Sequence, residues 1–572
     1  MDKAVLEKAK IWLNDAFDAE TQKEVQHLID NDPATLEEAF YKNLEFGTGG
    51  MRGIMGVGTN RLNKYTLGLA TQGLANYLKN EVKNKSLKVA ITHDVRNNSE
   101  SFAKIVANIL SANGIKVYLT DGFRPTPMLS FAVRHYSCDA GIVLTASHNP
   151  PEYNGYKVYW NDGAQIVPPH DNGIINEVNN TQVKDVLFNG NNHLIEYVGN
   201  ELDEAFIKTS ISSISKEKTG RDKVKIVFTS LHGTAIKTIP FALEKAGFTD
   251  VHIVEEQANP DPYFSTVKSP NPEEPEALKM AIDLADKINA DIVIGTDPDA
   301  DRLGIAVRDF NGKMILLNGN QTNVVLTDYL LQKWQKEGKI NGKQFIGSTI
   351  VTSDVFFDLA KHYHVTCKAG LTGFKWIGKM IHDAEGKEDF IGGGEESFGY
   401  MVGDFVRDKD SVTSTLLACE IAAVAKTNGS SFYNELAKVY AQVGCYQEHL
   451  IALVKKGLDG AQQIKSIMIQ LRENPLHEIL GSKVVQINDY QSSISKNRLT
   501  GKETMLDVPK SNVLIYYTEN GTKVAARPSG TEPKIKFYFS VKGELKNPKD
   551  FPVVQQELQR KIEEIIADMK LD

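Results

Sequence analysis

The sequence predicts an α/β protein: three similar α/β domains with mixed sheets, followed by a C-terminal α+β domain, arranged around a central cleft. Three observations support this prediction. The chain has 572 residues, more than one hydrophobic core can serve. Short β-branched runs alternate with helical patterns, and this alternation restarts twice along the chain. The final section differs, because apolar runs there flank an Asn-Gly turn, which is typical of antiparallel hairpins.

The repeated alternation begins near residue 87, restarts near 223 and appears again from about 315. The apolar runs are, in order, LKVAITHD, IKVYLTDG and DAGIVLTASHN; KVKIVFTS, DVHIVEEQ and DIVIGTDPDADR; and QFIGSTIVTS and DFIGGGEESFGY. Each unit ends a strand in a polar loop rich in Gly or Asp. Ligands of open α/β sheets lie beyond the carboxyl ends of strands, so three such loops facing one another would frame one site.

The two ends of the chain complete the domain plan. Residues 1–45 carry apolar side chains at three- and four-residue steps, which predicts an amphipathic N-terminal helix packed on the body. These side chains are Leu6, Ala9, Trp12, Leu13 and Phe17. A closing helix is expected to end near residue 570. We place the domains at 1–205, 206–320, 321–447 and 448–572.

Composition and charge limit the classes of function that the protein can have. The chain has 65 Lys plus Arg against 73 Asp plus Glu, a net charge of −8, and no basic domain that would indicate nucleic-acid binding. The sequence contains no apolar stretch of about 18 residues, so no membrane span is predicted. The four cysteines lack metal-ligand spacing, which favours a reducing compartment. We expect a cytoplasmic protein with no nucleic-acid or membrane partner.

The first candidate loop is TASHNPPEYNGYKVYW, residues 145–160. Ser147 follows an apolar strand and precedes two prolines that hold the loop open, so its hydroxyl can be displayed to a ligand. The alternative is an ordinary cap or turn serine. Lys157 lies ten residues further on, in an alternating strand that returns to the same end of the sheet.

The second loop is the more specific one, because three carboxylates alternate along it after a buried strand. Asp297, Asp299 and Asp301 can converge on one hard cation such as Mg²⁺, which prefers carboxylate oxygens and keeps positions open for phosphate. A calcium loop is excluded, since Arg302 and Arg308 stand where Gly and Glu are needed. The remaining alternative is a solvated acidic turn.

Charge arithmetic links these two loops. A phosphate of roughly −2 on Ser147 and three aspartates would exceed the charge of one divalent cation, so further cations are needed. Arg302, Lys157 and Arg52 are the candidates, because arginine binds phosphate bidentately and lysine supplies a point charge or an acid/base group. Arg52 lies in the Gly-rich segment 46–56, which a plain tight turn explains equally well.

Two further loops have the chemistry of sugar and phosphate recognition. Glu395 and Ser397 offer a carboxylate and a hydroxyl to vicinal sugar hydroxyls, and the upstream Thr372-Gly373 turn can assist. In the last domain, an Arg, two hydroxyls and a Gly make an anion nest, with a hairpin loop as the plain alternative. These four residues are Arg527, Ser529, Gly530 and Thr531.

Together, TASHNP, DPDADR, GGEESFG and RPSGTEPK resemble the motifs of the α-D-phosphohexomutase superfamily, from about Phe46 to about Lys536. The chain is most similar to the long phosphoglucomutase branch that also contains phosphopentomutases. The resemblance implies four domains whose loops line one central cleft. The chain departs from mannose-specific members, because Phe398-Gly399-Tyr400 replaces a loop ending in Gly-His, and this leaves the sugar preference open.

The resemblance also implies roles for the candidate residues. Ser147 would be the phosphoserine, and the three aspartates would hold Mg²⁺ together with a phosphoserine oxygen. Lys157, His148 and Arg52 would serve acid/base and charge roles. The substrate would contact the remaining residues, which are Arg302, Thr372, Gly373, Glu395, Ser397, Lys409, Arg527, Ser529, Gly530 and Thr531.

The implied activity is a reversible conversion of glucose 1-phosphate and glucose 6-phosphate through a bisphosphorylated sugar, with glucose 1,6-bisphosphate as activator. The alternatives are a phosphomannomutase, a phosphopentomutase acting between the 1- and 5-phosphates, a sugar bisphosphate synthase or phosphatase, and a non-catalytic sugar-phosphate sensor. We expect small sugar phosphates as the partners, and a monomer or weak homodimer.

Overall fold

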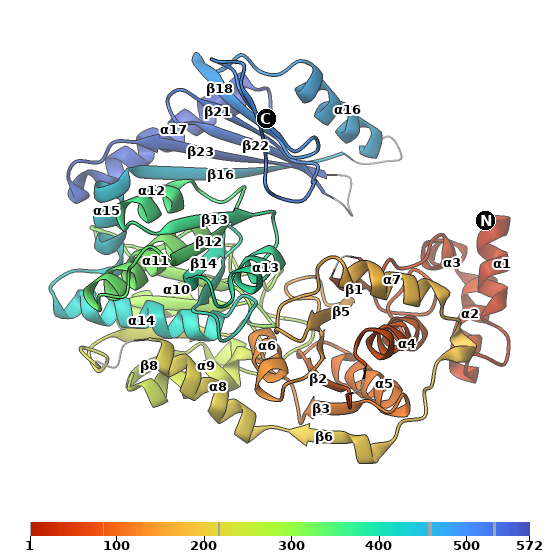
Figure 1. Ribbon diagram of the computed structural model, residues 1–572. Helices are drawn as coiled ribbons and strands as arrows, with labels where there is room; N and C mark the ends of the chain where they lie inside the picture. The colour runs from red at the N-terminus through yellow and green to blue at the C-terminus, as the bar shows by residue number, and fades with distance from the viewer. Residues whose placement is uncertain are drawn as a thin grey trace.

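The computed structural model describes residues 2–47, 49–83, 85–214, 218–455, 460–529 and 534–571. Four sheets follow one another along the chain. In Figure 1 the first three α/β units form the lower part of the molecule, and the fourth sheet lies over the third unit. This confirms the predicted fold class. Within the described residues, no helix combines the length and the apolar character needed to span a membrane.

The first three sheets share one strand topology. Each contains two parallel strands, then the strand that precedes a candidate loop, and then an antiparallel strand that returns beside it. The loop-preceding strands β4 (Ala140–Leu144) and β9 (Ile292–Thr296) are buried at every position. Continuous apolar runs of this kind are what central strands covered on both faces require.

The first sheet has the order β1-β5-β4-β2-β3-β6. Its other strands are β1 (Gly50–Ile54), β5 (Tyr153–Trp160), β2 (Lys88–His93), β3 (Lys116–Thr120) and β6 (Ile195–Val198). Its helices are α4 (Lys64–Glu81), α5 (Ser99–Ala112), α6 (Thr126–His135), α7 (His170–Asn180) and α8 (Asn200–Ser213). The Asn63 and Thr66 side chains form a capping box that begins α4.

The second and third sheets repeat this plan in shorter form. The second has the order β11 (Met314–Leu316), β10 (Leu303–Arg308), β9, β7 (Lys225–Thr229), β8 (Asp250–Ile253), with helices α9 (Ala235–Ala246) and α10 (Lys279–Ile288). The third has the order β13 (Thr366–Gly370), β12 (Gln344–Thr349), β14 (Asp389–Glu395), β15 (Gly399–Val402). Its helices are α11 (Gly319–Lys336), α12 (Val355–His362), α13 (Lys375–Ala384), α14 (Ser411–Thr427) and α15 (Phe432–Val443).

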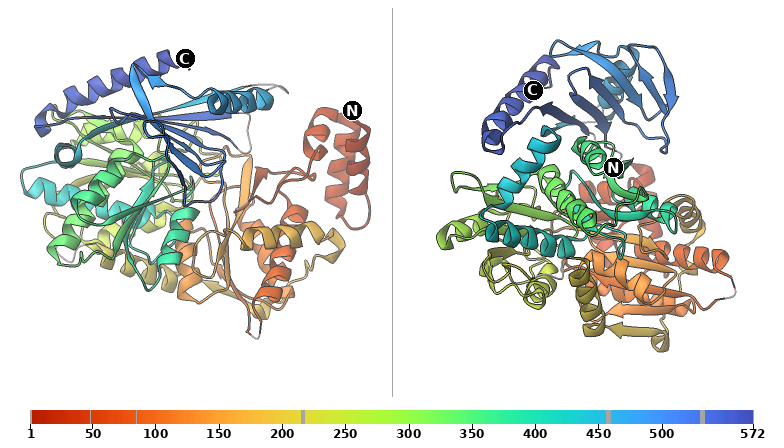
Figure 2. Two further views of the ribbon diagram at one scale, coloured as in Figure 1. Left: turned by 45° about the horizontal axis from the view of Figure 1, so that its top comes forward. Right: turned by 60° about the vertical axis from the view of Figure 1, so that its left-hand side comes forward.

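The fourth sheet is antiparallel throughout. Its order is β16 (Cys445–Val454), β23 (Lys534–Gly543), β22 (Lys523–Pro528), β21 (Leu514–Thr518), β18 (Ser482–Asp489), β19 (Ile494–Asn497), β20 (Glu503–Met505), with β17 (Glu478–Ile479) beside β18. Helices α16 (Gly460–Glu473) and α17 (Phe551–Asp568) pack on it. The right-hand view of Figure 2 shows this sheet as a separate layer beyond the third unit.

The N-terminal region differs from the prediction of one amphipathic helix. It forms three short helices, α1 (Lys3–Ile11), α2 (Ala19–Asn31) and α3 (Pro33–Phe40). The start of the second helix has a local cause, since the Asp18 side chain accepts the Thr21 N–H and caps α2. The predicted apolar residues still cluster, because the Trp12 and Phe17 rings stack with centroids 4.6 Å apart.

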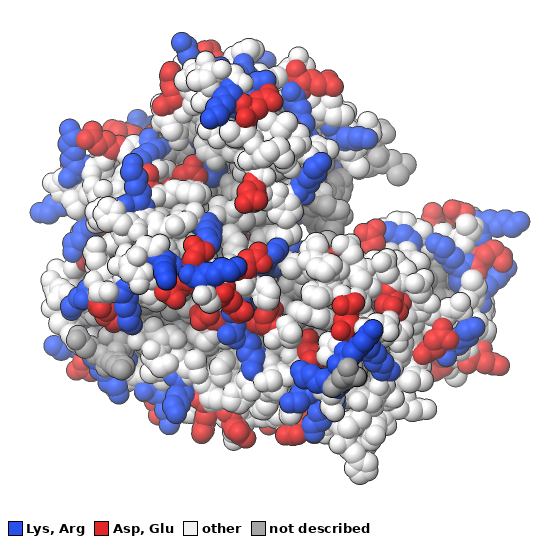
Figure 3. Space-filling view, viewed as in Figure 1, with Lys and Arg blue, Asp and Glu red and all other residues white. Residues whose placement is uncertain are grey.

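A shared core joins the units. One continuous cluster of buried apolar side chains runs from α6 in the first unit through the second and third sheets to α17. The face of the first sheet that carries α4 and α5 has a separate core. On the face viewed in Figure 3, the surface is hollowed between the lobe of the fourth unit at the top and the lobe of the first unit at the right.

Candidate active site

The same turn carries a candidate loop in each of the first three units, between β4 and β5, β9 and β10, and β14 and β15. Each turn places one non-glycine residue in the left-handed region: Ser147 at φ 51°, Ala300 at φ 56° and Phe398 at φ 63°. Such a conformation costs about 1 to 3 kcal/mol and persists only where the surroundings enforce it. The units therefore enforce the same strained turn three times.

These three loops contact one another directly. The Ser147 Oγ donates to Asp297 Oδ2 at 2.6 Å, which joins the first loop to the second. The Leu303 N–H donates to the Phe398 carbonyl at 2.9 Å, which joins the second loop to the third. The expectation that the loops face one another at one place is thus met by hydrogen bonds between residues far apart in sequence.

The backbone of the Ser147 loop is held by Arg96, which follows strand β2. The Arg96 guanidinium donates to the carbonyls of Ser147 at 2.6 Å, Pro150 at 2.8 Å and Tyr153 at 3.1 Å, and to that of Asn149. One guanidinium therefore gathers four carbonyls, and this leaves the serine hydroxyl directed at Asp297.

Arg96 is itself fixed by the buried Asp94. Its Nε lies 3.3 Å from Asp94 Oδ2, and the same carboxylate accepts hydroxyl donors from Thr145 and Ser99, each at 2.6 Å. Sequence reasoning missed Asp94 and Arg96. The signal was present, because they too are polar residues directly after a buried strand.

The three aspartates converge, with one oxygen of each within 4.8 Å of the others. Asp299 Oδ2 accepts from Lys157 Nζ at 3.0 Å and from Thr126 Oγ1 at 2.9 Å, while Asp301 Oδ2 lies 3.5 Å from Lys157 Nζ and 3.2 Å from Lys409 Nζ. The other oxygen, Oδ1, of both Asp299 and Asp301 is buried without a hydrogen-bond partner among the described residues.

This arrangement suits a divalent cation. The Oδ2 atoms of Asp299 and Asp301 face protein cations, while within the described part of the chain their Oδ1 atoms have no hydrogen bond and only Arg302 Nε, 3.9 Å from Asp301 Oδ1, lies in ion-pair range. Buried carboxylate oxygens without a hydrogen bond are costly unless a cation pairs them. Burial and the neighbouring Asp299 and Asp301 charges raise the pKa of Asp297 well above its ordinary value. The donor set is all carboxylate oxygen, which is the set that Mg²⁺ prefers.

Two lysines from different units flank the acid cluster. Lys157 belongs to β5, and Lys409 follows the third sheet, just before α14. Burial lowers the pKa of Lys157, but Asp299 and Asp301 outweigh it and the pKa is raised. The pKa of Lys409 is likewise raised, since Asp301 and Asp408 outweigh its burial. Both side chains are therefore cations held against the aspartates.

The other predicted cations lie close by. Arg302 forms an ion pair with Glu273, and its backbone N–H donates to Asp297 Oδ1 at 2.9 Å. His148 Nδ1 lies 3.2 Å from Ser147 Oγ. Burial, with Arg302 and Arg52 nearby, lowers the pKa of His148 to about 2, so its ring is neutral. Arg52 is an exposed residue of β1, with Gly155 as its strand partner.

The third loop lies beside these groups. Glu395 is buried, and burial raises its pKa although Lys409 opposes the shift. Ser397 is half-buried one residue before the left-handed Phe398. Thr372 and Gly373 form the turn between β13 and α13, and the next ring, Phe374, has its centroid 5.6 Å from Lys409 Nζ. The structure thus places this turn near the acid cluster.

The fourth loop is only partly described. Arg527 is the next-to-last residue of β22 and lies opposite Lys536 of β23, and the Ser529 N–H donates to the Lys534 carbonyl at 2.8 Å. Gly530 and Thr531 lie outside the described residues. Burial lowers the pKa of Lys536, as do Lys534 and Arg527, while Glu396 and Glu273 oppose the shift. Lys536, at this end of the fourth sheet, therefore lies within electrostatic range of Glu396 and Glu273.

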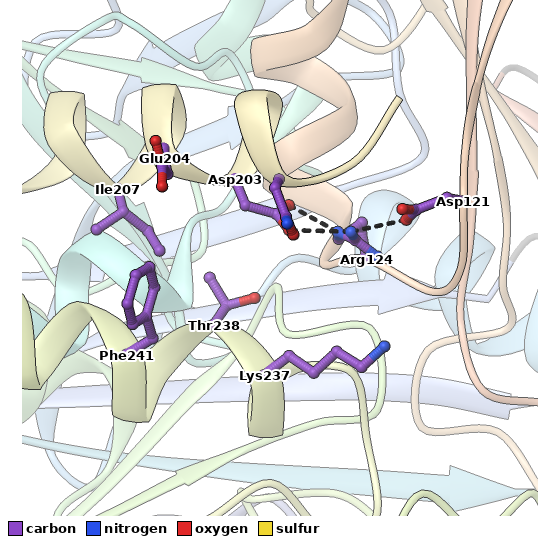
Figure 4. Close-up of a pocket in the computed structure, with 9 residues that line it drawn as sticks. Asp121, Arg124, Asp203, Glu204, Ile207, Lys237, Thr238 and Phe241 are labelled. Carbon is purple, nitrogen blue, oxygen red and sulfur yellow. Dashed lines mark hydrogen bonds and ion pairs between the residues drawn. The ribbon is translucent and has the colours of Figure 1, made fainter. Parts of the chain in front are cut away.

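A cavity of about 530 Å³ lies elsewhere, between α8, α9 and the loop after β3. Figure 4 shows that Arg124 points at Asp203 and Asp121 there. Its Nε and Nη2 donate to the two Asp203 oxygens at 2.6 and 2.9 Å, and Nη2 also donates to Asp121 at 2.9 Å. None of the predicted site residues lines this cavity, so we place the candidate site at the acid cluster.

Comparison with known proteins agrees with this geometry. Sequence profiles for α/β/α domains I, II and III of the phosphoglucomutase/phosphomannomutase family match residues 43–185, 204–312 and 318–440. The phosphoglucomutase of Staphylococcus haemolyticus is 38% identical over 538 residues, which cover 93% of this chain and 96% of that one. The phosphoglucomutase of Staphylococcus aureus strain MRSA252 is 40% identical over 509 residues, covering 88% and 91%.

Solved structures show the same fold at low sequence identity. A phosphoglucomutase/phosphomannomutase family protein from Burkholderia thailandensis superposes with a TM-score of 0.64 at 18% identity, covering 92% of this chain and 97% of that one. The open form of parafusin, a phosphoglucomutase from Paramecium, superposes with a TM-score of 0.63 at 16% identity, covering 92% and 96%. The loops, the acid cluster and these matches agree: the chain belongs to the phosphoglucomutase/phosphomannomutase family.

Proposed function

We propose that the protein is a Mg²⁺-dependent phosphoglucomutase that interconverts glucose 1-phosphate and glucose 6-phosphate through a phosphorylated Ser147 and a bound glucose 1,6-bisphosphate. The observation that carries the proposal is the position of the Ser147 hydroxyl, 2.6 Å from Asp297 within the cluster of three aspartates. Ser147 is only 6% exposed, but a serine hydroxyl held on a strained turn beside a cation site is the arrangement that a phosphoryl carrier needs.

The chemistry is a pair of opposite phosphoryl transfers. In the first, the bond between Ser147 Oγ and phosphorus breaks while phosphorus bonds the free hydroxyl oxygen of the sugar monophosphate. The proton of that hydroxyl leaves to a base, and Ser147 Oγ regains a proton. The bisphosphate then turns over within the site, and its other phosphoryl group returns to Ser147. No phosphate is released and no oxidant is needed.

Catalysis here rests on positioning and charge neutralisation. Mg²⁺, when bound by Asp297, Asp299, Asp301 and a phosphoserine oxygen, would supply positive charge to the transferred group. Arg302 and Lys157 add protein cations, and Lys157, His148 and Arg52 serve the acid/base and charge roles around Ser147.

The substrate would contact the other loops. Glu395 and Ser397, with Lys409 and the Thr372-Gly373 turn, would bind the sugar hydroxyls. Arg527, Ser529, Gly530 and Thr531 would hold the phosphate that is not reacting. The proposed domains, 1–205, 206–320, 321–447 and 448–572, each give one loop to this site. We further propose a cytoplasmic enzyme that acts as a monomer or weak homodimer.

Intact-mass measurement tests the carrier role. The isolated protein should carry about 80 Da of extra mass from one phosphoryl group, and incubation with glucose 1-phosphate should remove it. Ser147→Ala should lose both the extra mass and turnover. A sensor would carry no exchangeable phosphate, and a phosphatase would release inorganic phosphate. Either result would contradict the proposal. So would a Ser147→Ala variant that keeps a tenth of the normal rate.

The sugar preference needs a separate measurement. Initial rates with glucose, mannose and ribose 1-phosphates, each with the matching bisphosphate, should be highest for glucose. A higher rate with ribose 1-phosphate or mannose 1-phosphate would instead favour a phosphopentomutase or a phosphomannomutase. Accumulation of a sugar bisphosphate would indicate a synthase.

A further inference from the structure

Lys409 reaches the acid cluster from a segment where the first three units meet. Residues 407–411 bridge to the first unit at Ala164. They join the second unit through Ser411, whose Oγ donates to the carbonyl of the left-handed Ala300 at 2.5 Å. The third unit holds the same segment through the Asp410 N–H, which donates to the Tyr400 carbonyl at 2.8 Å.

The side chain of Asp408 connects this segment to the first sheet. One of its oxygens, Oδ1, accepts from the Lys409 backbone N–H at 2.8 Å and lies 3.3 Å from Lys409 Nζ. The other, Oδ2, accepts from the Tyr159 hydroxyl at 2.6 Å. Asp408 is 4% exposed and Tyr159 is fully buried, so water does not compete for either oxygen.

Tyr159 and Lys157 belong to the same face of one strand. Side chains two residues apart on a strand point the same way, and both residues lie on β5. Lys157 therefore contacts Asp299 and Asp301 directly, while Tyr159 reaches the far side of the cluster through Asp408 and Lys409. Asp301 Oδ2 lies between the two ammonium groups, at 3.5 Å from Lys157 and 3.2 Å from Lys409.

We propose that Tyr159 and Asp408 are positioning residues that hold Lys409 against Asp301 and the substrate. The Tyr159 hydroxyl occupies one oxygen of Asp408, so only the other oxygen is left to Lys409. Without that hydroxyl, the Asp408 carboxylate can turn both oxygens to the ammonium and draw it away from Asp301. The inference deepens the proposed function and rests on it for its kinetic consequences.

Tyr159→Phe is the sharpest test, because it removes one hydroxyl and keeps the buried ring. The variant loses a hydrogen bond to a charged group, and this loss should leave Lys409 misplaced in the transition state. We therefore expect kcat to fall about tenfold to a hundredfold, with KM changed less than about twofold. Asp408→Asn should give a loss of similar size, and the double variant should be little worse than either single one, since both act through Lys409.

The matched control is Tyr156→Phe. Tyr156 is equally buried on β5, but it points to the opposite face and packs in the separate core of the first unit. Its kcat should stay within about twofold of the parent protein. If Tyr159→Phe also retains its kcat, or if it loses thermal stability together with a matching rise in KM, the pair is only a structural tether and the positioning role is wrong.

A labelling experiment decides the inference independently of turnover. Limited acetylation with acetic anhydride, followed by peptide mass spectrometry, reports the reactivity of Lys409 relative to Lys157 in the same molecule. Tyr159→Phe should change this ratio several-fold, because Lys409 would exchange its contact with Asp301 for the second Asp408 oxygen, and Tyr156→Phe should not. An unchanged ratio in Tyr159→Phe would overturn the inference. If the parent protein shows no mutase turnover, the proposed function is wrong, and the labelling ratio still tests the positioning of Lys409.

Discussion

The molecule has two kinds of junction between its units. The central junction joins the first three units, and the outer junction joins the fourth unit to the third. At the central junction, buried charged groups from three units share partners, as Lys157, Asp301 and Asp408 show. At the outer junction, Lys523 of the fourth sheet donates to the Thr352 carbonyl at 2.9 Å and to Asp354 Oδ1 at 2.7 Å. A second lysine, Lys542, lies 2.5 Å from Asp358.

The aspartates of the two junctions differ in their exposure to solvent. The side chains of Asp299 and Asp301 are 0% and 2% exposed, whereas those of Asp354 and Asp358 are 28% and 32% exposed. Separating the central groups would strand buried charges, at a cost of about 3 to 5 kcal/mol for each pair. Water can reach Asp354 and Asp358 at the outer junction, although the Lys523 side chain is itself only 4% exposed, so we expect the fourth unit to move more readily than the central groups.

The outer junction nevertheless reaches the site. Thr352, whose carbonyl binds Lys523, donates its hydroxyl to Glu396 Oε2 at 3.0 Å, and Glu396 belongs to the third loop. At the same end of the fourth sheet as Lys542, the Phe551 ring packs on Tyr433 and Tyr440 with centroids 5.3 and 5.4 Å apart. The junction of the fourth unit thus combines apolar packing with partly hydrated ion pairs, and we treat this unit as a lid over the site.

Breaking the central junction should have the largest effect. Asp299→Asn keeps the shape but loses the charge that pairs Lys157 and a cation, so we expect kcat to fall about a hundredfold or more. Chelation of divalent ions should inactivate the parent protein to a similar degree, and added Mg²⁺ should restore it. Calorimetry should show sugar-phosphate binding little changed and Mg²⁺ binding weakened.

The control for this variant is Asp283→Asn, which removes an exposed charge paired with Lys279 on α10. It should leave kcat and the Mg²⁺ response unchanged. If Asp299→Asn responds to Mg²⁺ as the parent does, the acid cluster is not the cation site.

Changing the loop of the fourth unit should act mainly on substrate binding. Arg527→Ala removes a cation from the end of β22, so we expect KM for glucose 1-phosphate to rise about tenfold, with kcat within about threefold. Steady-state rates measure both. Arg560→Ala, on the exposed side of α17, should leave KM unchanged. Equal KM values in the two variants would remove Arg527 from the site.

Much of the central site could be predicted from the sequence, because its signals are local. Polar residues directly after apolar strands identified the loops that contain Ser147 and Asp297, and the shared strand topology explains why those loops meet. The three repeated α/β units and the antiparallel ending were predicted for the same reason, since strand runs and turns are patterns of neighbouring residues. The roles of the individual site residues stay predictions.

The residues that hold the site in place were missed, because their partners are distant in sequence. Tyr159 and Asp408 are 249 positions apart, and no periodicity links a buried tyrosine to a carboxylate in another unit. Arg96 lies just after a buried strand, which was a usable signal, but the carbonyls that it binds leave no side-chain pattern to identify its partners. The N-terminal prediction of one helix was wrong because the apolar spacing continued through a break where Asp18 starts a new helix.

The smallest expected effect comes from loosening the outer junction at Lys523. Lys523→Met keeps the length of the side chain and removes the ammonium that binds Thr352 and Asp354. Because Asp354 is partly exposed and can be hydrated, we expect the free energy of unfolding to fall by only about 1 to 2 kcal/mol. KM should rise about twofold to fivefold, since Thr352 also holds Glu396, while kcat should not change.

Lys542→Met is the matched control for this last variant. It removes the neighbouring lysine of the same junction, but its partner Asp358 lies on α12, beyond the segment that holds Glu396. Urea unfolding should show a loss of stability of similar or smaller size, and KM should stay at the parent value. If both variants raise KM equally, the position of the fourth unit as a whole affects substrate binding, and the contact between Thr352 and Glu396 has no special role. If neither does, the outer junction contributes stability alone, and the contrast between a fixed centre and a coupled lid is lost.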